Sequence, residues 1–256
     1  MDILHIIIII FIFTIPFLYR LVRTGSFSFY IKRQKYNLDE NYKKAEIVRI
    51  FQVLFLLLFL LFHGYIFWGI LNLAIFIIIT FLVSMLMEII GEKSGITFGG
   101  KYKYNLNLTP GPSLFSIPIL IPLAWIILIY MSYNLFCFIG NFNVIEIIME
   151  RNIKLLIVPC IMLVLLDFIL DPIAVDEKRW EWNIKGNYYG VPLLNFFGWF
   201  INSLIILLLL SYFFLPFEIQ AINVENIKYL PGVIFIFIHL ACLLYTSPSP
   251  RDFQVS

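Results

Sequence analysis

Residues 51–90 read FQVLFLLLFLLFHGYIFWGILNLAIFIIITFLVSMLMEII, and this stretch decides the fold class. Glu88 is its single acidic residue, and it contains no Lys or Arg. A transmembrane helix needs about 20 consecutive apolar residues, so the stretch is long enough for two. Gly64, Gly69 and Asn72 offer the only break in the apolar pattern. We therefore predict two membrane-spanning helices joined there as a tight hairpin.

The rest of the chain repeats this pattern. Hydrophobic residues make up 61% of the 256 residues and charged residues only 13%, far from the usual soluble composition. Apolar runs long enough to span a bilayer fall near 3–19, 48–68, 71–90, 114–133, 153–170, 193–215 and 230–245. Seven such helices with short loops use nearly the whole length. The sequence thus predicts an all-α polytopic membrane bundle of about seven transmembrane helices, forming one domain over residues 1–245.

The C-terminal residues are distinct from the apolar runs. Residues 243–252 read LLYTSPSPRD, which resembles translated sequencing-adapter read-through. We therefore expect 246–256 to be a tail of non-native sequence, and we assign no function to it.

Basic residues are concentrated in alternate loops, which predicts the orientation in the membrane. Three loops, 20–49, 91–113 and 171–192, hold fourteen Lys and Arg residues, and the opposite loops hold three, namely Arg151, Lys154 and Lys228. The rule that basic loops stay inside places these three loops in the cytoplasm and the N-terminus outside the cell membrane. The net charge of +2 is too small to indicate a nucleic-acid partner.

Neither a metal site nor a cofactor site can be read from the sequence. Cys137, Cys160 and Cys242 lack the spacing of a metal or redox motif, and the three histidines are scattered. The glycines between 91 and 100 follow no strand and lack the Gly-Lys-Ser/Thr order of a phosphate loop. We therefore predict that no metal and no cofactor is used.

Acidic residues at the ends of two apolar runs are the candidate catalytic groups. Glu88 and Glu92 are four residues apart at the end of the third helix, as are Asp167 and Asp171 at the end of the fifth. Residues with this spacing share one helix face. A carboxyl group about a turn inside a span costs about 2.5–3.5 kcal/mol on insertion scales, so it normally faces the bundle interior. We expect the third and fifth helices to be neighbours, with Glu88 and Asp167 facing inward.

Burial in an apolar pocket favours the neutral, protonated carboxyl group, which can act as a general acid. The alternative is a structural role. In that reading Glu92 and Asp171 mark the membrane interface, and Glu88 pairs with Lys93 or with a backbone group.

Aromatic residues surround the same predicted face of the membrane. Tyr102 and Tyr104 alternate with lysines, which predicts a short extended segment with both rings on one side. A second group follows the fifth helix and comprises Trp180, Trp182, Tyr188, Tyr189 and Trp199. An interfacial aromatic belt explains Trp and Tyr at helix ends, but it does not explain Asn195 about a turn inside the sixth helix. We predict that these aromatic residues and Asn195 line a substrate pocket, because aromatic faces also stabilise cations.

Three strings carry a family resemblance: EKSGITFGGKYKYN at 92–105, IPILIPLAWIILIYMSY at 117–133 and LDPIAVDEKRWEWNIKGNYYGVPLLNFFGWF at 170–200. They resemble the carotenoid biosynthesis protein family, which includes membrane hydratases acting on bisanhydrobacterioruberin and on γ-carotene ends. The resemblance covers roughly 50–215. It implies addition of water to the terminal 1,2 double bond of an acyclic carotenoid end. The implied partners are a lipid-soluble polyene substrate, membrane lipids and possible further enzymes of the pathway.

Chemistry then suggests roles for the acidic residues. Asp167 or Glu88 would protonate C2 of the polyene, and Asp171 or Glu92 would orient the water that attacks the tertiary cation at C1. Two other readings stay open. Asp167 and Asp171 could hold magnesium against a diphosphate, as in a membrane prenyltransferase. The bundle could instead bind, scaffold or transport a carotenoid without catalysis, with coupled protons at Glu88 and Asp167 in the case of transport.

Overall fold

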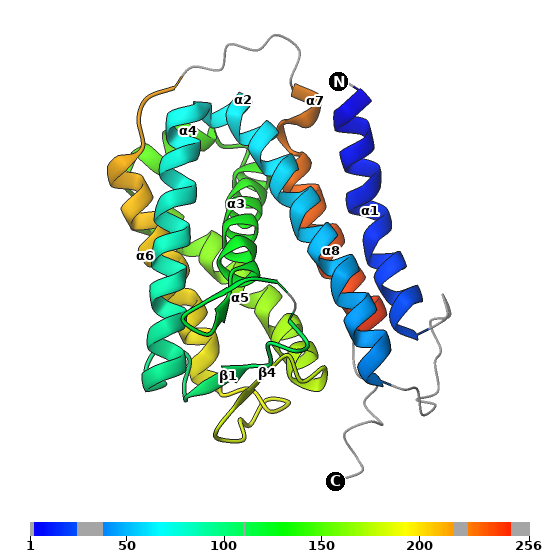
Figure 1. The fold of residues 1–256 in the computed structure, drawn as a ribbon. Helices are drawn as coiled ribbons and strands as arrows, with labels where there is room; N and C mark the ends of the chain where they lie inside the picture. The colour runs from blue at the N-terminus through cyan, green and yellow to red at the C-terminus, as the bar shows by residue number, and fades with distance from the viewer. Residues whose placement is uncertain (1–2, 25–37, 110, 218–224, 247–256) are drawn as a thin grey trace.

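The computed structural model describes residues 3–24, 38–109, 111–217 and 225–246. These residues form an elongated helical bundle with two small two-stranded sheets (Figure 1). The elements, in chain order, are α1 (Ile3–Thr24), α2 (Leu38–Ser94), β1 (Tyr102–Tyr104), β2 (Ser113–Leu114), β3 (Ile117–Pro118), α3 (Leu120–Gly140), α4 (Val144–Met149), α5 (Ile153–Asp176), β4 (Trp180–Trp182), α6 (Leu193–Phe213), α7 (Glu225–Lys228) and α8 (Leu230–Thr246).

The predicted hairpin lies within α2. A straight α-helix of its 57 residues would be about 85 Å long, but the chain reverses at Gly69, where φ is 76° and ψ is 161°. This left-handed φ favours glycine, and a Cβ at Gly69 would lie 2.6 Å from the ring of Phe217. Asn72 fixes the turn, because its amide donates to the Trp68 carbonyl at 2.9 Å and to the Leu215 carbonyl at 2.8 Å. The hairpin prediction is confirmed.

Among the described residues, four helices are long and apolar enough to cross a membrane: α2, α3, α5 and α6. Two shorter apolar helices cover 9–19 in α1 and 230–241 in α8. All seven predicted apolar runs therefore lie largely in helices, and the helical membrane class agrees with the structure. A count of seven membrane crossings stays a prediction.

The fourth predicted helix begins and ends later than its apolar run. The run starts at 114, whereas α3 begins at Leu120 and continues to Gly140. Residues 113–118 form the β2–β3 hairpin instead, with Phe115 and Ser116 in the left-handed region at φ 51° and 71°. Hydrophobicity alone could not distinguish this apolar turn from the first turn of a helix.

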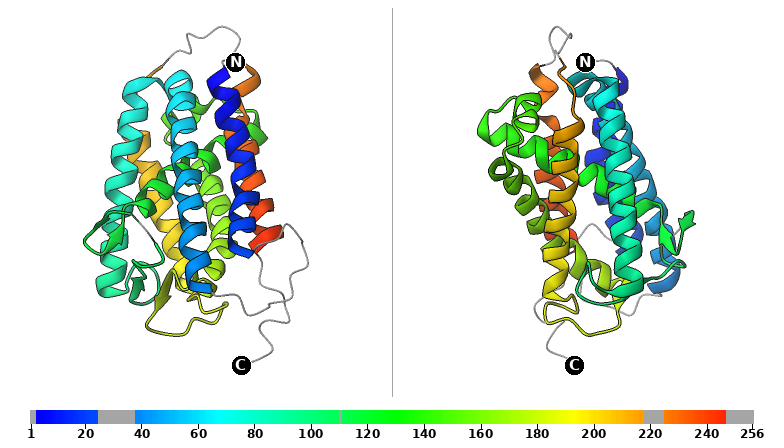
Figure 2. Two further views of the ribbon diagram at one scale, coloured as in Figure 1. Left: turned by 45° about the vertical axis from the view of Figure 1, so that its right-hand side comes forward. Right: turned by 90° about the vertical axis from the view of Figure 1, so that its left-hand side faces the viewer.

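The helices that carry the predicted site, α2 with Glu88 and α5 with Asp167 and Asp171, each pack against several neighbours. α1 packs against α2 and α8, and α5 packs against α3, α6 and α8. The second half of α2 descends beside α6 (Figures 1 and 2). This arrangement corrects the expected direct packing of the third and fifth helices, because both pack instead against α3 and α6, which connect them. The inward orientation of their carboxyl groups is confirmed, since Glu88 is 5% exposed and Asp167 is fully buried.

The loops at 91–113 and 171–192 lie at one end of the bundle, where β1 pairs with β4 (Figure 1). The pairing is antiparallel and matches Tyr102 with Trp182, Lys103 with Glu181 and Tyr104 with Trp180. The predicted extended segment at Tyr102 and Tyr104 is thus confirmed as a strand. Of the first basic loop, 20–49, residues 25–37 lie outside the described part of the chain.

The strand pairing can be tested by cross-linking. Lys103 and Glu181 are paired and exposed, and directly opposed antiparallel residues have Cα atoms about 4.5–5.5 Å apart, within disulfide range. In a cysteine-free background, Lys103→Cys with Glu181→Cys should form a disulfide under mild oxidation, detected as a mobility shift that reductant reverses. Lys103→Cys with Lys185→Cys serves as the control. Equal cross-linking of both pairs would contradict the register.

Candidate active site

Two aspartates and one asparagine form the first part of the site. Asp167 and Asp171 lie one turn apart on α5, so both face α6. The Nδ2 atom of Asn195, in the first turn of α6, donates to Asp167 Oδ2 at 2.9 Å and to Asp171 Oδ2 at 2.5 Å. All three side chains are at most 2% exposed. Two buried carboxyl groups that share one amide donor can share one proton, because two adjacent negative charges would repel each other.

Glu88 forms the second part, and three donors surround it. Its Oε1 accepts from Trp125 Nε1 at 3.0 Å. Its Oε2 accepts from Tyr104 Oη at 2.7 Å and from Tyr102 Oη. Burial and the nearby Glu88 raise the pKa of both tyrosines well above 10, so they remain neutral donors at physiological pH. The fixed donors hold Glu88 in place as a hydrogen-bond acceptor.

Trp125 is a site residue that sequence reasoning missed. It is 2% exposed in α3, and its ring packs on that of Trp199 with centroids 4.2 Å apart. Its position in a long apolar run gave no sign of a polar role. The signal that could have identified Trp125 is its indole N–H, because a buried indole N–H usually has a hydrogen-bond partner.

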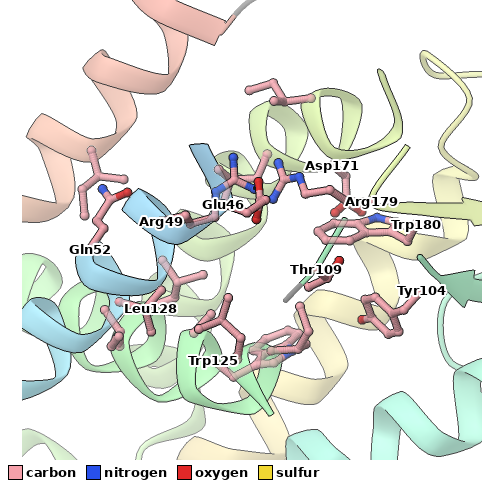
Figure 3. A pocket seen from close by; sticks show the side chains of 18 of the residues that line it. Glu46, Arg49, Gln52, Tyr104, Thr109, Trp125, Leu128, Asp171, Arg179 and Trp180 are labelled. Carbon is pink, nitrogen blue, oxygen red and sulfur yellow. The ribbon is translucent and has the colours of Figure 1, made fainter. Parts of the chain in front are cut away.

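A cavity of about 240 Å³ joins these groups. Asp171, Glu88 and Asn195 reach it, and Asp167 lies behind Asp171 without lining it. Figure 3 shows Tyr104, Trp125, Asp171 and Trp180 around this space. Most of its wall is hydrocarbon or aromatic, and the aromatic lining consists of Tyr19, Phe98, Tyr102, Tyr104, Trp125, Trp180, Trp182 and Trp199. Of the predicted pocket residues, this set includes Tyr102, Tyr104, Trp180, Trp182 and Trp199.

Three predicted site residues lie elsewhere. Glu92 is partly exposed at the end of α2 and does not line the cavity. Tyr188 packs on Phe168 and Phe196, and its hydroxyl donates to the Phe168 carbonyl at 3.1 Å. Tyr189 is 48% exposed. The spacing of four residues aligned Glu92 with Glu88 on the helix, but Glu92 lies a full turn further toward the helix end.

A second polar group, which we term the charged cluster, consists of Tyr19, Glu46, Arg49, Glu177 and Arg179. Arg49 contacts Glu46 at 3.1 Å and Glu177 at 3.2 Å, and Arg179 contacts Glu177 at 2.9 Å. Tyr19 donates to Glu177 at 3.1 Å. Tyr19, Glu46, Arg49 and Arg179 line the same cavity as Asp171. Only the spacing of Glu46 and Arg49 at i,i+3 hinted at this group in the sequence.

The arrangement suits proton transfer to a hydrocarbon. A carboxyl pair that can hold one proton presents Asp171 to a largely apolar space walled by aromatic rings, and aromatic faces stabilise a carbocation. Within the described ranges, no group of three or more His, Cys, Asp and Glu side chains is placed to hold a metal ion.

Comparison with known proteins gives one match. The family model described as "Carotenoid biosynthesis protein" matches residues 46–249, which is most of the chain and includes both parts of the site and the charged cluster except Tyr19. No curated protein and no solved structure matches the chain.

The role of Asn195 can be tested against a matched residue on the same helix. Asn202 is also fully buried in α6, but neither of its side-chain polar atoms has a hydrogen-bond partner among the described residues. Asn195→Leu leaves two buried carboxyl groups without their shared donor and should lower the free energy of unfolding by about 1–3 kcal/mol. Asn202→Leu should be neutral or stabilising. Thermal unfolding of both variants in detergent measures the difference, and equal destabilisation would contradict the assigned hydrogen bonds.

Proposed function

The chain belongs to the carotenoid biosynthesis protein family, and we propose that it adds water to the terminal 1,2 double bond of an acyclic carotenoid end. The observation that carries this proposal is the position of Asp171. It faces an apolar, aromatic cavity and is backed by the buried Asp167, with which it shares the Asn195 donor. A proton source inside a hydrocarbon-binding space is what protonation of an alkene requires.

The reaction begins with transfer of the shared proton from Asp171 to C2 of the polyene. The π electrons of the 1,2 bond form the new C–H bond, which leaves a tertiary cation at C1. Asp167 keeps its hydrogen bond from Asn195 and so stays beside Asp171 as the second carboxyl group of the pair. Water then forms the C1–O bond, and its surplus proton passes to a cavity carboxylate. The net change is addition of one water molecule, and no electrons are transferred to or from the polyene.

Glu88 has a different role from the aspartates in this proposal. Its three bonds from Tyr102, Tyr104 and Trp125 occupy both oxygens as acceptors, so it is held rather than free to deliver a proton. A fixed carboxylate near the cation lowers its energy, as do the rings of Trp125 and Trp199. In this proposal Asp171 is the acid and Asp167 its partner in the shared proton. Glu92 has no role in the mechanism.

Substitutions separate these roles. Asp171→Asn retains shape but removes the transferable proton, so the rate of hydroxylated product formation should fall by about 10²–10⁴-fold. Trp199→Leu should reduce the rate less, because one ring contributes about 0.5–2 kcal/mol to a nearby cation. The measurement is pigment mass analysis in a lycopene-producing host, normalised to the amount of protein in the membrane. Wild-type activity in Asp171→Asn would contradict the proposed acid.

A chelator distinguishes this reaction from the magnesium-dependent transferase. Each carboxyl group of the site already accepts a hydrogen bond from the protein: Glu88 from Tyr102, Tyr104 and Trp125, and Asp167 and Asp171 from Asn195. We therefore expect that EDTA does not change the rate of product formation in isolated membranes. Loss of product that added Mg²⁺ restores would favour the transferase. Binding of the polyene with unchanged mass would favour a carotenoid-binding bundle.

We also propose that the protein crosses the cell membrane several times, with the β1–β4 end in the cytoplasm. The basic loops at 91–113 and 171–192 support this orientation, because basic residues stay on the cytoplasmic side. Ile96 and Ile184 are exposed at that end, and Glu150 is exposed directly after α4. Each is replaced singly by Cys in the cysteine-free background. A membrane-impermeant thiol reagent added to intact cells should label only Glu150→Cys. Labelling of Ile96→Cys from outside would reverse the orientation.

A further inference from the structure

The charged cluster offers unused hydrogen-bonding groups to the cavity. Glu46 is 1% exposed, and its Oε2 atom has no hydrogen-bond partner among the described residues. Arg49 Nη1 lies 3.1 Å from Glu46 Oε1, but within the described part of the chain no acceptor lies in line with its N–H bonds. Both residues line the cavity. A buried carboxylate oxygen without a donor is costly, so a polar ligand on the cavity side is expected to satisfy it.

The chemistry of these groups indicates a small neutral ligand that both donates and accepts. Glu46 can only accept when ionised and Arg49 can only donate. The two acids and two arginines of the cluster balance in charge, so the group does not select an ion. A buried water needs two to four polar partners and about 10–15 Å³ of accessible volume, and the cavity of about 240 Å³ is large enough to hold it beside a hydrocarbon end.

The cluster also lies close to the proposed acid. Arg179, which pairs with Glu177, acts electrostatically on Asp171. Figure 3 shows Glu46, Arg49, Arg179 and Asp171 along one wall of the cavity. A molecule bound at Glu46 and Arg49 therefore shares the cavity with the polyene end that Asp171 would protonate.

We propose that Glu46 and Arg49 form the water-binding subsite of this cavity, which holds the nucleophilic water and accepts its proton. This inference rests on the proposed hydration. Arg49 donates to the water oxygen, and Glu46 accepts one of the water hydrogens. As the oxygen forms its bond to C1, the O–H bond to that hydrogen breaks and the proton passes to Glu46. Proton exchange with solvent then returns Glu46 to the carboxylate and Asp171 to the acid.

Deuterium labelling separates water capture from protonation. In D₂O, Asp171 transfers a deuteron to C2. A cation that is not captured by water loses a proton to the Asp171 carboxylate and returns to an alkene carrying deuterium. Glu46→Gln removes the proton acceptor but leaves Asp167, Asp171 and Asn195 in place. Its hydration rate should fall by about 10²-fold, the lower range for loss of a general base. Deuterium should meanwhile accumulate in the recovered polyene.

The controls use isolated membranes with lycopene as the probe, and mass spectrometry measures both products. Glu181→Gln removes an exposed carboxylate on β4 that does not line this cavity, and it should match wild type. Asp171→Asn should lose hydration and deuterium incorporation together.

Two results would overturn the water subsite. One is wild-type hydration in Glu46→Gln, and the other is parallel loss of hydration and deuterium incorporation in folded Glu46→Gln, which would indicate a structural role. Failure of the proposed hydration gives a different result from failure of the water subsite. In that case the wild-type protein itself would produce neither the alcohol nor deuterated polyene.

Discussion

The burial of acidic side chains inside an apolar helical bundle is the constraint on which the remaining structure depends. A carboxyl group that leaves water is stabilised by polar partners or by a shared proton, because the surrounding hydrocarbon offers no hydrogen-bond donor. Asp167 and Asp171 find them in one amide, that of Asn195, which connects α5 with α6. Glu88 finds them in α3 and β1. Satisfying these groups thus determines which helices and strands must meet at one end of the bundle.

The β1–β4 sheet makes this possible although it is very small. A strand places alternate side chains on one side, so Tyr102 and Tyr104 both reach Glu88. Pairing with β4 brings Trp180 and Trp182 against the same tyrosines, with ring centroids 5.7 and 5.8 Å apart. One short sheet therefore supplies two of the three donors to Glu88 and four of the eight described aromatic residues that line the cavity.

Sequence patterns predicted local features well and long-range contacts poorly. Hydrophobic runs located the helices, the break near Gly69 located the hairpin, and spacing by two and by four residues placed Tyr102 with Tyr104 and Asp167 with Asp171. Periodicity says nothing about which helix supplies a partner, so Trp125 and the charged cluster were missed. It also grouped Glu92 with Glu88, because a shared helix face does not show where a cavity ends.

The central claim is that the protein adds the oxygen of water to a polyene end held beside Asp171. Incubation of wild-type membranes with lycopene in ¹⁸O-labelled water, under ordinary oxygen, tests it most directly. The account predicts a tertiary alcohol whose hydroxyl oxygen carries the label in the proportion present in the water. An alcohol whose oxygen comes from O₂ would contradict hydration, and so would recovery of lycopene with no alcohol formed by well-folded protein.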